Sequence, residues 1–165
     1  MTDVLAQLFR HNHWANLKII DWCESIPAEA LDVPSSGTFG SPRATLVHLL
    51  AAEEGYLRLI DVPPPDASVR GLDTFPGFDA LRRAAEYTGR AFVTAAEAIG
   101  PEGVWRGQWG GSEYEVDQAV VMMQVINHAT EHREQIKDAL SRADYPAPEV
   151  DSWAFAHEKN LMRKV

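Results

Sequence analysis

The sequence has one cysteine, Cys23, among 165 residues, so the chain cannot form an internal disulfide. A lone thiol in an apolar helical segment is typical of a protein from a reducing compartment, where it packs as a small hydrophobic group. The N-terminus also lacks the basic segment and apolar run that mark a secretory signal. We therefore expect a cytoplasmic location.

Basic residues and long apolar runs are also scarce. Lysine and arginine number 15 against 24 aspartates and glutamates, which gives a formal net charge of −9. A polyanion would be repelled on average, and no basic run offsets that repulsion. No uninterrupted apolar stretch approaches the ~20 residues that span a bilayer. We expect neither nucleic acid nor a membrane as a partner.

The residues that are present are those of an ordinary globular protein, with 45 % hydrophobic and 24 % charged residues. No internal repeat, low-complexity segment or interdomain linker interrupts the chain, so we predict a single domain over residues 1–165. Helical periodicity predicts four long helices, over residues 2–25, 42–60, 79–99 and 117–143, and a short one over 151–161. A loop rich in proline, residues 61–76, reads as a crossover between the second and third. The fold class is therefore all-α, an antiparallel four-helix bundle with short additions.

Local signals place the ends of these helices. Thr2 or Asp3 can cap the first, whose buried face we assign to Val4, Leu5, Leu8, Ala15, Ile19 and Trp22. Pro27 and the following AEAL predict one extra turn. Ser41 followed by Pro42 is an N-cap and first helical residue, and Gly100-Pro101 ends the third helix.

Residues 104–116, VWRGQWGGSEYEV, predict a short β-hairpin, because Gly110-Gly111 is a tight-turn signal between two alternating segments. The alternative is that Ser112 and Glu115 form a capping box and start the fourth helix early. We favour the hairpin, with Asp117 as the N-cap.

Two histidines four residues apart, His128 and His132, lie on or beside the apolar face of the fourth helix. Residues at this spacing stack one above the other, so both imidazoles can aim at a common point. A working metal site needs at least one further ligand, and His48 of the second helix is the best candidate. Small residues on its stripe, Ala52 and Gly55, leave space beside it. The alternative is three unrelated histidines, each satisfied by a carbonyl or by water.

Three motifs in order resemble the DinB-like (YfiT-type) superfamily of metal-binding bundles. The first helix has HNHWAN, close to the family's Tyr-Asn-x-Trp-Ala-Asn, with His11 in place of tyrosine. The second has LVHLLAAEEGYL, similar to Leu-x-His followed by a glutamate, Glu53, and an aromatic residue. The fourth has NHATEHREQI, similar to His-x-x-x-His-Arg-Gly-Gln, with Glu134 in place of glycine. The match covers nearly the whole chain.

The resemblance implies an up-down-down-up bundle that binds zinc or nickel through His48, His128 and His132. Related members include bacillithiol- and mycothiol-dependent transferases and isomerases, and we expect a homodimer. If position 11 borders the cavity, His11 could act as an acid, a base or a fourth ligand. Its alternative is a partly exposed surface histidine.

Three imidazoles leave a divalent ion its full charge and an open position, which activates bound water or holds a substrate thiol as thiolate. Spacing does not separate a hydrolase from a thiol transferase. Glu53 and Gln135 are candidates to orient the ligands, against the alternative of helix–helix polar contacts. The segment HATEH also fits an inverted zinc-peptidase signature with Glu131 as base, although no carboxylate ligand accompanies it. A di-iron bundle is excluded, because it needs Glu-x-x-His on two helices.

Two functional hypotheses remain. The first is a metal-dependent enzyme, a low-molecular-weight-thiol S-transferase or a related hydrolase acting on a small molecule. The second is a non-catalytic, stress-linked dimeric bundle whose ion pins the second helix to the fourth. Three protein ligands favour an open, catalytic site.

Overall fold

The computed structural model describes residues 4–72, 74–98 and 103–164. Within those ranges the chain forms six α-helices, one 3-10 helix and one two-stranded antiparallel sheet, so it is mostly helical as predicted. In the same ranges, none of the helices combines the length and the apolar character needed to cross a lipid bilayer. The predicted caps Thr2 and Asp3 and the helix end at Gly100-Pro101 lie outside the described residues.

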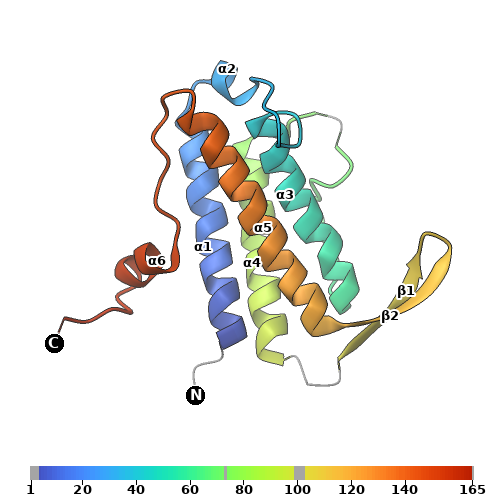
Figure 1. Cartoon of the computed structure of the whole chain (residues 1–165). Helices are drawn as coiled ribbons and strands as arrows, with labels where there is room; N and C mark the ends of the chain where they lie inside the picture. Colours follow the sequence, from blue (N-terminus) through green and yellow to red (C-terminus); the bar gives the residue numbers. More distant parts are fainter. Residues whose placement is uncertain (1–3, 73, 99–102, 165) are drawn as a thin grey trace.

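Four long helices lie side by side (Figure 1), namely α1 (Val4–Glu24), α3 (Pro42–Leu57), α4 (Phe78–Ala98) and α5 (Gln118–Ser141). Helices α1 and α3 each pack against both α4 and α5. In the view of Figure 1, α1 and α5 run upward and α3 and α4 run downward. The segment between α3 and α4 therefore carries the chain back to the upper end, as the proline-rich crossover predicted.

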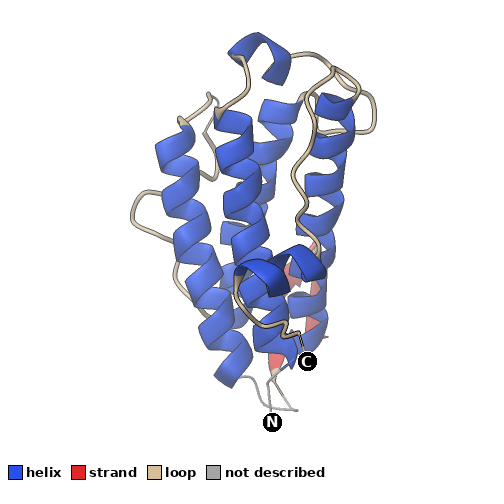
Figure 2. Ribbon diagram, turned by 90° about the vertical axis from the view of Figure 1, so that its left-hand side faces the viewer, coloured by secondary structure: helices blue, strands red, loops and turns tan. Residues whose placement is uncertain are grey.

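The short elements sit at the ends and on one side of these helices. Helix α2 (Ala28–Leu31) is the extra turn expected after Pro27, and the 3-10 helix η1 (Arg58–Ile60) continues α3. The C-terminal segment runs along the helices and ends in α6 (Ser152–Glu158), which packs against α1 (Figure 2).

The hairpin prediction is confirmed over the capping-box alternative. Strand β1 (Val104–Trp109) pairs with β2 (Ser112–Asp117) in a register that places Trp109 opposite Ser112. The two-residue turn between them, Gly110-Gly111, has φ of 60° and 82°. Positive φ at both central positions is the geometry that fits the twist of a hairpin and that glycine adopts without strain.

Side-chain caps begin α3 and α5 at the two residues that the sequence predicted, and a third cap begins α6. Ser41 accepts a hydrogen bond from the Ala44 amide, and Asp117 accepts one from the Ala119 amide. Asp151 caps α6 in the same way. The predicted ends of α5 and α6 are two and three residues too long, because the last turn of a helix carries a weaker sequence signal than its cap. The helix predicted to end at Ile60 reaches that residue as α3 followed by η1.

The core consists of two apolar clusters, one toward each end of the helices. The predicted buried face of α1 is partly wrong, because Val4 and Leu8 are 72 % and 43 % exposed. Ala6 and Phe9 are buried instead, and the Phe9 ring stacks on Phe92 of α4 at 5.1 Å between centroids. The first half of α1 therefore buries against α4 a different face from the one that residue spacing predicted.

Candidate metal centre

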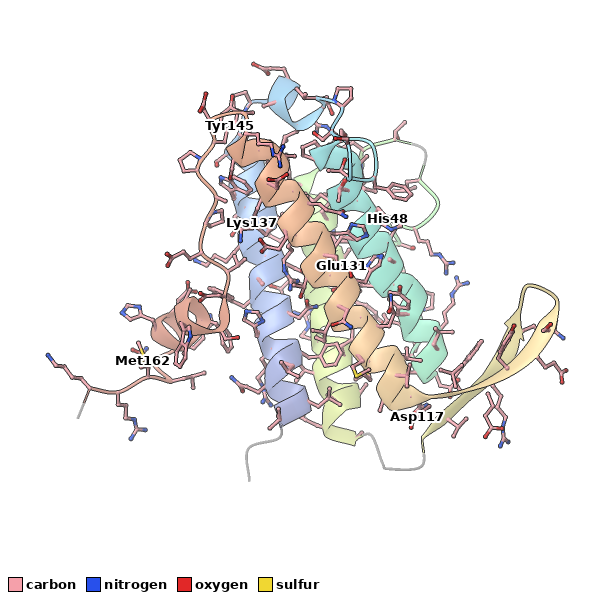
Figure 3. All side chains as sticks on the ribbon, in the orientation of Figure 1. His48, Asp117, Glu131, Lys137, Tyr145 and Met162 are labelled. Carbon is pink, nitrogen blue, oxygen red and sulfur yellow. The ribbon has the colours of Figure 1, made fainter. Side chains whose placement is uncertain are left out.

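The three predicted histidines come together between α3 and α5. His48 projects from α3 toward α5 (Figure 3), and His128 and His132 lie one turn apart on α5. The Nε2 atom of His128 is 3.3 Å from that of His48 and 3.1 Å from that of His132. One nitrogen from each ring lies within 4.8 Å of the other two. In the described part of the chain, no other group of His, Cys, Asp or Glu side chains meets this criterion.

These separations fit a shared divalent cation. Ligand nitrogens at roughly 2.0–2.1 Å from a tetrahedral zinc ion are about 3.3 Å from one another. Three neutral imidazoles with converging lone pairs repel each other, and a cation between them relieves that repulsion. The donor set therefore suits zinc or a similar metal that imidazole binds.

Burial and the neighbouring rings disfavour the protonated form of His48 and His128. Burial is the main cause that lowers the pKa of His128 to about 4, and the neighbouring His132 and His48 lower it further. The pKa of His48 is lowered by burial and then by His132. A neutral imidazole is the form that donates a lone pair to a metal.

Gln135 fixes the orientation of the His132 ring. The Nδ1–H group of His132 donates to Gln135 Oε1 across 2.7 Å, which leaves Nε2 with its lone pair directed at the other rings. This contact is the one expected of a residue that orients a metal ligand. The structure thus places Gln135 beside the site.

Two aromatic rings border the histidines, and sequence reasoning missed the first. Phe39 stacks on the His48 ring at 3.8 Å between centroids and 10° between planes, while 58 % of Phe39 remains exposed. Tyr56 meets the His128 ring edge-on at 5.7 Å. The only sequence signal for Phe39 is a lone aromatic residue in a loop rich in serine and glycine.

Glu53 lies in the core, in a network that reaches all four long helices. Its Oε1 accepts hydrogen bonds from the side-chain amides of Asn12 and Asn16, each at 2.8 Å, and its Oε2 accepts one from Thr88. Arg133 Nη1 donates to the amide oxygens of the same two asparagines. Glu53 thus makes the helix–helix polar contact that was the alternative to orienting a ligand.

Arg133 follows His132 in the sequence but points into the core network instead. It is 3 % exposed, and burial lowers its pKa to about 10. The two asparagines separate its guanidinium from the Glu53 carboxylate, so the opposite charges interact through a polar bridge. We assign Arg133 a structural role.

His11 and Glu131 are placed away from the three histidines. The Nε2 atom of His11 lies 2.8 Å from the carbonyl oxygen of Val150, and its ring packs against Trp14 and Phe155. Burial lowers the pKa of His11. Glu131 is exposed and outside the histidine group. His11 therefore joins α1 to the C-terminal segment, and Glu131 is not one of the converging groups.

Comparison with known proteins adds one finding. A family model described as "DinB family" matches residues 1–162. No curated protein matches the chain, and no solved structure matches it either.

Proposed function

Because the chain belongs to the DinB family, we propose that it is a metal-dependent enzyme whose zinc or nickel ion is held by His48, His128 and His132. The convergence of three imidazole nitrogens is the observation that carries this proposal. We further propose that the arrangement of α1, α3, α4 and α5 is the up-down-down-up antiparallel bundle implied by the family resemblance. A homodimer remains a prediction.

The proposed reaction is S-transfer from a low-molecular-weight thiol to an electrophilic small molecule, with hydrolysis as the related chemistry. A bound divalent ion with an open position supplies a thiolate or hydroxide at neutral pH. The three histidines contribute no charge that would reduce its Lewis acidity. Gln135 holds His132 in the tautomer that leaves Nε2 free, and Phe39 covers one face of His48.

Metal content tests the ligand assignment. We expect wild-type protein, purified without a nickel column, to retain about one metal ion per chain after dialysis, and His128→Ala to retain none. His157→Ala is the control, because His157 is exposed on α6. Full metal occupancy in His128→Ala protein would refute the assignment.

Turnover tests the chemistry. Metal-loaded protein should consume a reporter electrophile only when a low-molecular-weight thiol is present. Equal consumption without thiol would favour hydrolysis. No consumption across a broad panel of electrophiles would favour the non-catalytic bundle.

A further inference from the structure

An arginine lies on the same face of α3 as His48. A Cβ atom added at Gly55 would lie 3.5 Å from both Cζ and Nη1 of Arg70, so the guanidinium rests on the bare helix surface at that glycine. Gly55 follows His48 by seven residues, which is nearly two full turns. The two positions therefore share one face of α3, about 10 Å apart along the axis.

The backbone of Arg70 is held in place from inside the protein. Glu54, which is 1 % exposed, accepts hydrogen bonds from the Arg70 amide at 3.2 Å and from the Val69 amide at 3.1 Å. The Ser68 hydroxyl donates to the same carboxylate and also accepts from the Arg70 amide. The 68–70 segment is thus anchored to α3, so the side chain of Arg70 starts from a fixed point.

The Arg70 guanidinium makes no hydrogen bond or ion pair with the described residues. Most other described arginines do pair with a carboxylate, namely Arg10, Arg43, Arg82, Arg90, Arg106 and Arg142. The Arg70 guanidinium thus has no partner among the described residues, and it lies on the face of α3 that carries His48, in a chain of net charge −9. Guanidinium groups bind carboxylates and phosphates in a bidentate manner.

We propose that Arg70 binds an anionic group of the substrate, a carboxylate or a phosphate at the end of the molecule remote from the atom that meets the metal. This inference rests on the proposed function and narrows it, because it names the substrate as an elongated anion. The guanidinium lies in van der Waals range of the α3 surface at Gly55, which fixes where along the helix it is presented. The long side chain of Arg70 can adjust to the length of the ligand.

A binding assay with cobalt-loaded protein tests the proposal without turnover. The probes are 6-mercaptohexanoate and 6-mercaptohexanol, which end in an anionic carboxylate and a neutral hydroxyl group. The thiolate-to-cobalt absorption band reports the affinity of each probe. We expect the acid to bind about tenfold more tightly than the alcohol, because a charge-assisted hydrogen bond forms at Arg70. For the shorter pair, 3-mercaptopropionate and 3-mercaptopropanol, the difference in affinity should be much smaller, because the carboxylate does not reach Arg70.

Variants show whether the preference for the acid comes from Arg70 or from the general attraction of the metal for anions. In Arg70→Gln protein the preference for the acid should fall to within about twofold, while Arg70→Lys should keep part of it. Arg106→Gln, which removes a charge from the distant hairpin, should leave the preference unchanged. Unchanged thermal unfolding of each variant confirms that the fold is intact.

The possible failures are distinguishable. A thiolate band with the same preference for the acid in wild-type and Arg70→Gln protein overturns the role of Arg70 and leaves the metal site standing. Absence of cobalt binding or of any thiolate band overturns the proposed function itself.

Discussion

At the scale of single residues, the side chains that touch a ligand histidine control how well the site is preorganised. Gln135 accepts the Nδ1–H of His132. We expect Gln135→Leu to weaken zinc affinity about 10- to 100-fold, because the ring loses the contact that fixes its tautomer. Gln135→Glu keeps an acceptor at the same place and should retain tight binding. Competition with a chromogenic chelator measures the zinc affinity of both variants. An affinity of Gln135→Leu protein equal to that of wild-type protein would show that the contact does not orient the ring.

Cys23 illustrates a residue that burial makes inert. It is 1 % exposed, and burial raises the pKa of its thiol to about 12. Since the thiolate is the reactive form, we expect no reaction of the folded protein with Ellman's reagent at pH 8 and one equivalent of reaction in denaturant. Rapid labelling of the native protein would contradict this placement.

At the scale of the elements, helix α3 depends on the residue that caps its N-terminus. Ser41 accepts the hydrogen bond of the Ala44 amide, which otherwise has no partner in the helix. Ser41→Ala should lower the free energy of unfolding by about 1 kcal/mol. Ser36→Ala, in the exposed part of the preceding loop, should change it little. Urea denaturation measures both variants, and equal stabilities would show that the cap contributes nothing.

The docking of α6 should depend on pH. Glu158 accepts hydrogen bonds from Lys18 and from the indole N–H of Trp14, and these contacts, that of Lys18 first, lower its pKa from 4.5 to about 2. A lowered pKa means that the carboxylate favours the docked state above about pH 4.5 and that this contribution is lost as the pH falls toward 2. The Trp14 indole N–H resonance should shift in that window. In Glu158→Gln protein that titration should disappear, and its persistence would assign it to another group.

At the scale of the whole molecule, one buried network joins the four long helices. Asn12 and Asn16 on α1 bridge Glu53 of α3 to Arg133 of α5, and Thr88 adds α4. Glu53→Gln removes one of two buried opposite charges and should lower the free energy of unfolding by about 3 kcal/mol. Glu131→Gln, on the exposed surface of α5, is the control and should change it little.

A double variant tests whether the two charges act together. Glu53→Gln combined with Arg133→Met leaves no buried charge unpaired, so its loss of stability should be clearly smaller than the sum of the two single losses. Simple additivity would show that the two charges do not interact across the asparagines. Either result leaves the metal ligands in place, so zinc affinity distinguishes a stability effect from damage to the site.

The sequence by itself determined the parts of this protein that are local. Helices, caps and the hairpin follow from periodicity and turn chemistry within a few residues, and the spacing of His128 and His132 brings two imidazoles together on one helix. His48 was the third candidate because small residues on its helix leave space beside it, and a family resemblance, which the family match confirms, then supported that choice.

Only the tertiary structure decided which residues surround that centre. Phe39 reaches His48 from a loop, and Arg70 reaches Gly55 from the crossover, neither with a periodic signal. The packing of α1 against α4 leaves Val4 exposed to solvent. The packing of α1 against the C-terminal segment places His11 against the Val150 carbonyl and not beside the three histidines. The spacing of residues along a helix determines only the direction in which their side chains point around that helix. Contacts between distant segments depend on how whole helices and loops pack together, and no short stretch of sequence encodes that packing.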